Sequence, residues 1–208
     1  METGKEVSGT LSVNVAGHEP GEVLTADVQV KSDSGRAPVI HVPVKVVVPR
    51  YQAAIDSGAG DGITDTLGDT WQPDRKYTQG SFGYQGTSNV MSTKKAIVGT
   101  DDPVLFQNAR KGMDEYRFDN VPNGVYTVEL DFAEVSGVEP NERVFDVLAE
   151  DTKVVSSLDI VRAGGAYTAV KRTVTATVTD GVLNVRFVGT KGKPLVNAIR
   201  VTDRPDKA

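Results

Sequence analysis

The chain has 208 residues, a formal net charge of −5 and no cysteine. Its length and its 38% of hydrophobic residues suit one large folded domain, or a large and a small one, and exclude wholesale disorder. The negative charge argues against a nucleic-acid binder, which needs a basic face, and no apolar run approaches the roughly 20 residues that span a membrane. Without cysteine, disulfides, thiol nucleophiles and thiolate zinc sites are excluded.

The residue mix favours strands over helices. Val occurs 33 times and Thr 19 times, against only 9 Leu. Branching at Cβ suits a pleated strand better than a helix, and no helical pattern extends beyond about two turns. We therefore predict an all-β protein, an antiparallel β-sandwich.

The first 50 residues contain three segments that alternate apolar and polar residues, at 11–15, 24–30 and 42–48. About seven strands make a complete sandwich, so we interpret residues 1–50 as a partial immunoglobulin- or fibronectin-like β segment. Its exposed edge is expected to pair with another strand. The start has no apolar signal-peptide region, which leads us to expect a piece of a longer chain.

The second domain is predicted over residues 51–208. Four aromatic residues gather in its first part, which has little periodicity: Trp71, Tyr77, Phe82 and Tyr84. Strands are clear from residue 114 onward, for example where Tyr126, Val128, Leu130 and Phe132 alternate with polar residues.

A hairpin is predicted over residues 170–188. Asp180 and Gly181 separate two alternating runs, and Asp-Gly is a strong hairpin signal. One face of the first run carries Thr173, Thr175, Thr177 and Thr179, which we expect to face solvent.

Histidine-based catalysis is excluded from the larger domain. The two histidines, His18 and His41, both lie in the first 50 residues, where we interpret them as ordinary turn and strand residues. A hydrolytic pair of carboxylates stays open on composition alone, from Glu129, Asp131, Glu134, Asp146 and Glu150. Glu129 and Asp131 fall on the polar side of an alternating strand, where charges are usually solvated, so we predict a non-enzyme.

One acidic loop could hold a hard cation. Asp61, Asp65 and Asp69 are spaced four residues apart among glycines, which allows calcium but does not match the EF-hand pattern. Asx turns are the plainer interpretation. The run 58–62 lacks the residues of a phosphate-binding loop, and no other cofactor is expected.

Aromatic rings in loops are the remaining functional signal. Rings flanked by polar side chains suit the C–H faces and hydroxyls of sugars. The candidates are Tyr77, Phe82, Tyr84 and Tyr167, although such rings also cap the ends of cores. Trp71 lies in a strand-like context, and we predict it in the core.

From about residue 51 to 203 the sequence resembles the malectin-like carbohydrate-binding domain. The resemblance rests on seven stretches in the family's order: 69–71, 102–110, 122–128, 130–135, 143–147, 158–160 and 194–199. It implies a β-sandwich that binds an oligo- or polysaccharide without catalysis.

The resemblance also implies site residues. Tyr84 matches a stacking aromatic, and Asp102, Arg110 and Glu134 are hydrogen-bonding candidates; Arg110 and Glu134 could instead form a structural pair. Other ligand positions of the family are replaced, by Lys111, by Ser136 and Gly137, and within Lys191-Gly192-Lys193. The fold is therefore expected to carry over, and the sugar specificity is not.

The N-terminal segment resembles the closing strands of immunoglobulin-like modules in large secreted bacterial proteins, including subtilisin-like proteases. Val42-Pro43-Val44 through Val48-Pro49 carries this likeness. It implies a secreted parent chain whose other domains are partners. The alternative function is a structural or protein-interaction accessory module without sugar binding. Neither nucleic acid nor a membrane is an expected partner.

Overall fold

The computed structural model describes residues 11–32, 35–36 and 38–207. The chain divides into two compact units, Met1–Pro49 and Arg50–Ala208.

The first unit is a two-stranded antiparallel ribbon. Strands β1 (Val23–Lys31) and β2 (Val39–Val47) pair from Val23 opposite Val47 to Lys31 opposite Val39. Residues 11–15 form no strand, so the prediction of a strand there, the first of the three, is wrong. None of the described residues of the first unit, 11–32, 35–36 and 38–49, is buried. Alternating sequence alone does not form a strand where no neighbour accepts its backbone hydrogen bonds.

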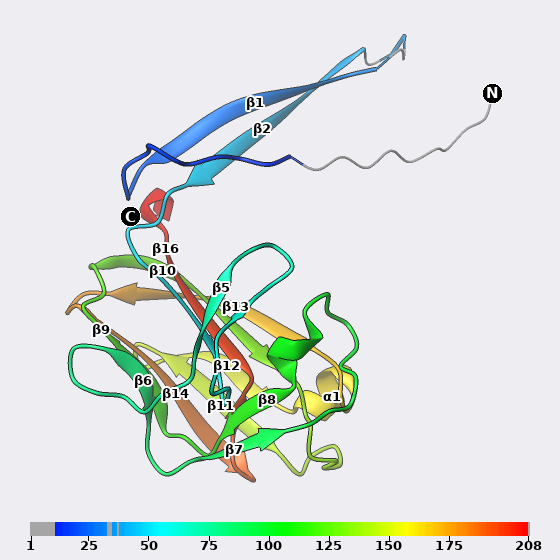
Figure 1. Ribbon diagram of the computed structural model, residues 1–208, viewed down its shortest axis with the longest axis vertical. Coiled ribbons are helices and arrows are strands. Elements are labelled where there is room, and N and C mark those ends of the chain that lie inside the picture. Colours follow the sequence, from blue (N-terminus) through cyan, green and yellow to red (C-terminus); the bar gives the residue numbers. More distant parts are fainter. Residues whose placement is uncertain (1–10, 33–34, 37, 208) are drawn as a thin grey trace. The chain divides into compact units, whose positions relative to one another are not determined.

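Two facing sheets build the second unit (Figure 1). The first sheet is antiparallel apart from one parallel pairing, between β3 and β5. In spatial order its strands are β13 (Val170–Val178), β10 (Gly124–Phe132), β16 (Ala198–Asp203), β3 (Gln52–Asp56), β5 (Thr70–Pro73) and β4 (Ile63–Thr64).

The second sheet is wholly antiparallel. Its spatial order is β12 (Thr152–Leu158), β11 (Val144–Ala149), β14 (Val182–Lys191), β9 (Glu115–Asp119) and β6 (Phe82–Gln85). A smaller sheet joins β15 (Leu195–Val196), β8 (Asn108–Lys111) and β7 (Asn89–Ser92). Short helical turns complete the unit: η1 (Pro103–Phe106), α1 (Ile160–Gly164) and η2 (Pro205–Lys207). The predicted all-β sandwich is confirmed.

The main core lies between the two sheets. Tyr126, Val128, Leu130 and Phe132 of β10 are all fully buried, as their alternation predicts. A second cluster gathers Trp71, which is 3% exposed, with η1 and neighbouring residues. The core position predicted for Trp71 is confirmed.

The predicted 170–188 hairpin is wrong. β13 pairs with β10 in the first sheet, while β14 pairs with β11 and β9 in the second. The Asp180-Gly181 turn therefore passes from one sheet to the other, with Gly181 at φ +82°. Both strands carry an apolar face, and placing them in opposite layers lets each face bury against the other sheet. The threonines at 173, 175, 177 and 179 are exposed, as predicted.

Candidate functional site

Tyr84 lies on β6, an edge strand of the second sheet. The guanidinium carbon of Arg110 is 3.9 Å from the centroid of the Tyr84 ring, and the ring of Tyr116 meets it edge-on at 6.4 Å. Tyr84 is partly buried. These contacts cover one face and one edge of the ring, so its orientation is set by the protein.

Arg110 is itself held from below by a buried carboxylate. Its Nε donates to Asp74 Oδ2 at 2.8 Å, and Asp74 also accepts from the Tyr116 hydroxyl at 3.0 Å and the Gly58 amide at 2.7 Å. Burial by itself would lower the pKa of Arg110, but the hydrogen bond and charge of Asp74 outweigh it and raise that pKa. Arg110 is therefore a permanent, immobile cation beneath Tyr84.

Glu134 belongs to a different buried ion pair. Arg143 Nε donates to Glu134 Oε2 at 2.6 Å, and the amide and hydroxyl of Ser136 donate to Oε1 at 3.0 and 2.6 Å. Arg143 also donates to the Lys193 carbonyl oxygen. The predicted structural pair of Arg110 with Glu134 is therefore wrong, because each has another partner. Glu134 anchors loops and has no free oxygen facing solvent, since its side chain is fully buried.

Four segments, made of strand ends and the loops beside them, are hydrogen-bonded to one another, and we call residues 84–87, 111–114, 134–143 and 189–194 the loop end. The Asp114 amide donates to the Gln85 carbonyl at 3.0 Å, and the Gly112 amide to the Pro194 carbonyl at 2.8 Å. A Cβ on Gly112 would stand 3.0 Å from the Lys193 side chain and 3.5 Å from the Thr87 carbonyl. Arg143 links the remaining loop to residue 193.

The loop end brings together the positions at which the family's ligand residues are replaced. Lys111, Ser136, Gly137 and Gly192 all lie in it, together with Tyr84. Tyr84 is the one ring among the predicted binding residues that lies there. The surface is consequently polar and lysine-bearing where rings were expected from the resemblance.

Phe82 and Tyr77 are not arranged as ligand platforms. Phe82 is 8% exposed, stacks on Phe118 at 6.1 Å, and carries the Arg75 guanidinium 3.7 Å from its centroid. Its prediction as a loop ring is corrected, because β6 points this side chain into the core. The Tyr77 hydroxyl donates to Asp119 Oδ2 at 2.6 Å, which fixes the loop before β6.

Asp102 and Tyr167 lie with the second core cluster rather than with Tyr84. Asp102 accepts from the amide and hydroxyl of Thr66 at 2.7 and 3.0 Å, so it holds a loop. Tyr167 packs against the second cluster, with the Lys95 ammonium 4.3 Å from its ring centroid. Of the predicted sugar-binding residues, the structure thus joins Tyr84 with Arg110 and places Asp102 and the Tyr167 ring elsewhere.

The acidic loop pairs with an arginine side chain in place of a metal ion. Asp65 accepts from Trp71 Nε1 at 2.9 Å and pairs with Arg200 at 3.1 Å, and Asp69 pairs with the same arginine at 2.7 Å. Asp61 is exposed. Within the described ranges no three histidine, aspartate or glutamate side chains are grouped as a metal site requires. The predicted calcium trio is therefore not assembled here.

The carboxylates considered for hydrolysis are each engaged within the fold. Asp131 is 4% exposed, which corrects the expectation that it is solvated, since the second cluster covers this part of the outer face. Burial raises its pKa to about 6 although Lys171 opposes this. Glu129 lies 3.8 Å from Arg200, Asp146 pairs with Lys153, and Glu150 accepts from the Asn184 amide at 2.7 Å.

Sequence reasoning missed the residues beneath the site. Asp56 is 1% exposed, neither of its oxygens has a hydrogen-bond partner, and burial followed by the charge of Asp74 raises its pKa to about 7. Asn197 is fully buried and joins three backbone segments, at Ala133, Phe106 and Asn108. Polar residues next to apolar strand runs are the only sequence signal of such positions.

Residues 51–206 match the family model of the malectin domain. The curated relatives of the chain include two of unlike kind. The kinesin-like protein KIN-14E of Oryza sativa is 29% identical over 143 residues, which are 64% of this chain and 13% of that protein. Malectin-B of Xenopus laevis is 33% identical over 89 residues, 41% of this chain and 32% of that protein.

Among solved structures, a Bacteroides uniformis β-glucuronidase is similar with a TM-score of 0.69 and 23% identity. The match covers 88% of this chain and 22% of the glucuronidase chain. This likeness shows the fold alone. The chain spans less than a third of the length of the curated relatives it matches, and these relatives carry unlike names, which is typical of a module used in different parent proteins.

Proposed function

Because the chain belongs to the malectin domain family, we propose that residues 51–208 form a module that binds glycans within a larger parent protein. The malectin domain is a non-catalytic binding module, and every carboxylate that could serve hydrolysis is engaged within this fold. The observation that carries the proposal is the rigid support of Tyr84 by Arg110 and Asp74 at the loop end. A site held in place before binding loses little conformational entropy when it binds.

The loop end has the two kinds of group that sugar recognition needs. The partly buried Tyr84 ring offers apolar surface for a sugar C–H face. Lys111, Thr87 and Lys193, which also belong to the loop end, carry groups that hydrogen-bond hydroxyls. One ring instead of several supports a weaker or different sugar specificity from that of the ring-rich family pattern.

A glycan-array screen of the purified chain tests this function. We expect binding to one glycan class, and a loss of about tenfold or more in affinity for Tyr84→Ala. Tyr84→Phe keeps the ring and should keep most of the affinity. Tyr167→Ala is the matched control, because that ring lies with the second cluster. The absence of binding to α- and β-glucans, galactans and chitin-type sugars would refute the proposal.

A protein-interaction module is the second candidate. Eight large apolar side chains are exposed among the described residues of the first unit, at Leu11, Val13, Val15, Val23, Val30, Val39, Ile40 and Val42. A two-stranded ribbon with open edges is suited to accepting a further strand. We propose that the missing strands come from neighbouring domains of the parent chain, as an immunoglobulin-like module would require. Fusing the chain to its preceding parent segment should then protect the β1 and β2 amides from hydrogen exchange; unchanged exchange would refute it.

Secretion of the parent protein and its bacterial origin stay predictions from the sequence. Across the described residues, no helix combines the length and apolarity needed to cross a bilayer. Locating the native protein by cell fractionation tests secretion directly, and recovery from the cytosol would contradict it.

A further inference from the structure

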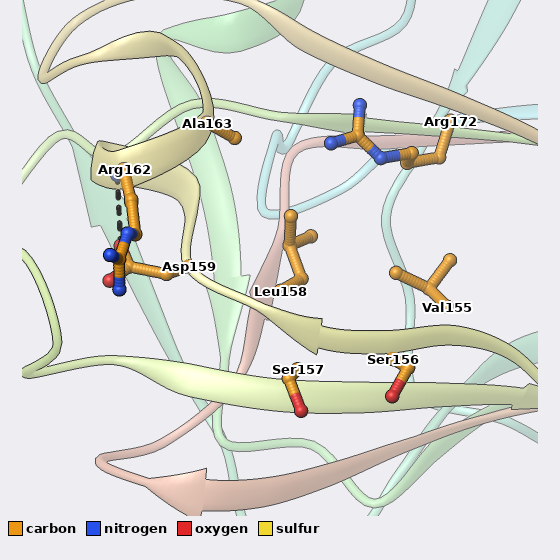
Figure 2. A pocket seen from close by; sticks show the side chains of 8 residues that line it. All are labelled: Val155, Ser156, Ser157, Leu158, Asp159, Arg162, Ala163 and Arg172. Atoms are coloured by element: carbon orange, nitrogen blue, oxygen red, sulfur yellow. Dashed lines mark hydrogen bonds between the residues drawn. The ribbon is translucent and has the colours of Figure 1, made fainter.

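A pocket of about 240 Å³ opens between β12, α1 and β13 (Figure 2). β12 and β13 are edge strands of the two opposite sheets, so the pocket lies where the sandwich is open along its side. It is separate from the Tyr84 ring, whose contacts are with Arg110 and Tyr116. Pockets that enclose drug-sized ligands measure about 300–1,000 Å³, so this one suits a single sugar residue.

Two arginines line the pocket, and neither is paired with a carboxylate. Among the described residues, seven other arginines form ion pairs with Asp or Glu. Arg162 and Arg172 form none, although the chain as a whole has a net charge of −5. The lining holds these two guanidinium groups and one carboxylate, that of Asp159, so its net charge is positive, which points to an anionic ligand.

The rest of the lining offsets only part of that positive charge. Asp159 also lines the pocket, where its oxygens accept the amides of Asn141 and Arg162, at 2.5 and 3.0 Å, and it forms no ion pair with Arg162 or Arg172. Figure 2 shows the guanidinium of Arg172 directed over Leu158. Arg172 is steadied by a 2.9 Å hydrogen bond from Nη1 to the Lys171 carbonyl.

The floor of the pocket is apolar. Val155 and Leu158 are 8% and 4% exposed, and Figure 2 shows both side chains on the Arg172 side of β12, with Ser156 and Ser157 on the other side. An apolar floor beneath guanidinium groups suits a ring with a C–H face and a charged substituent.

We propose that this pocket binds the acidic group of a charged sugar residue, a carboxylate or a sulfate ester. The inference rests on the proposed glycan-binding function and adds a second contact point with a stated ligand class. Lys191 of the loop end adjoins the pocket, since its Nζ donates at 2.9 Å to the Asn141 side-chain oxygen and the Asn141 amide donates to Asp159. One acidic chain can therefore contact both the loop end and the pocket.

Titration calorimetry on the full chain tests the proposal with three probes: a galacturonate oligosaccharide, its neutral methyl ester, and a sulfated galactan oligosaccharide. We expect the acidic probes to bind at least about tenfold more tightly than the ester. Comparison of the carboxylated and sulfated probes identifies which acidic group is preferred. Equal affinity for the neutral ester would overturn the inference.

Variants locate the site. Arg162→Gln and Arg172→Gln should each weaken acidic-probe binding by about tenfold. Arg186→Gln is the matched control, because Arg186 is exposed, pairs with Asp151 and is not among the residues that line the pocket. Unchanged affinity in both pocket variants would overturn the inference.

The failures of the two proposals can be told apart. Neutral glycan binding that depends on Tyr84, without any preference for acidic probes, would overturn only the pocket. Acidic-probe binding that depends on Arg172 and survives Tyr84→Ala would support the pocket and refute the loop end as the sole site. No binding of any glycan would refute both.

Discussion

Two neighbouring buried carboxyl groups near Tyr84, those of Asp74 and Asp56, differ in the number of hydrogen bonds that they accept. Asp74 has three donors, whereas the neighbouring Asp56 has none among the described residues. A buried carboxyl without a donor is stable only when it carries a proton. The support of the candidate site therefore contains a group whose charge depends on pH near neutrality.

Asp56 should make stability fall as the pH rises. Its pKa is raised from 3.8 to about 7 by burial and then by Asp74, so the native state binds this proton more tightly than the unfolded chain does. The free energy of unfolding is then highest below pH 3.8. It decreases by a few kcal/mol as the pH rises from 3.8 to about 7. Asp56→Asn should remove this decrease and stabilise the protein at pH 8, as measured by urea unfolding at pH 5 and 8.

Asp61→Asn is the control for that measurement, since Asp61 is exposed. Asp131 contributes a smaller total decrease of the same sign, because burial raises its pKa only to about 6 while Lys171 opposes the shift. An Asp56→Asn variant with an unchanged pH profile would show that Asp56 is ionised in the native protein.

Breaking the Glu134–Arg143 pair should be costly. Arg143→Met leaves a fully buried carboxylate without its cation, which destabilises proteins by about 3–5 kcal/mol. The double variant Glu134→Leu with Arg143→Met should recover part of that loss, because no unpaired charge stays buried. Chemical unfolding of the three proteins measures both effects, and a single variant as stable as the parent would contradict the ion pair.

At the scale of elements, β6 approaches a neighbouring segment too closely for any side chain at Gly83. A Cβ there would lie 2.5 Å from the Arg75 carbonyl oxygen and 2.6 Å from the Tyr77 nitrogen. The backbone hydrogen bonds from Tyr84 to Arg75 and from Tyr77 to Tyr84 hold this approach. Glycine at this position is therefore required for the placement of Tyr84.

Gly83→Ala should cost at least about 2 kcal/mol and disturb the Tyr84 ring. Gly80→Ala is a matched control, since Gly80 has φ +79° and open space around its Cβ position. That control should cost only the left-handed strain of about 1–2 kcal/mol. Thermal unfolding separates the two, and equal losses would mean that the close contact at Gly83 relaxes without cost.

Element pairing also marks where sequence reasoning succeeds and where it fails. The run from Tyr126 to Phe132 was predicted to alternate and does, because that pattern depends only on neighbours along one strand. The pairing of β13 with β14 was predicted from the Asp-Gly turn and is wrong, because the turn residues permit a reversal without choosing a partner strand.

At the scale of the whole molecule, the second unit should fold without the first. Both buried clusters lie within the second unit, and the described residues of the first contribute none to them. Residues 50–208 alone should unfold cooperatively at nearly the midpoint of the full chain, and residues 1–49 alone should show no cooperative transition in circular dichroism. A large loss of stability in the 50–208 fragment would contradict this.

Composition and local alternation were sufficient for the all-β class, the core position of Trp71 and the solvent-facing threonines, since each depends on nearby residues. The order of seven motifs along the chain indicated the family. The tertiary structure alone decided the partners of the charged residues: Asp74 meets Arg110 across 36 positions, and Arg50 meets Asp203 across 153. It also decided which strands share a sheet. Many strands of one chain have the same alternation and could pair equally well locally, so the choice depends on burying all apolar faces at once.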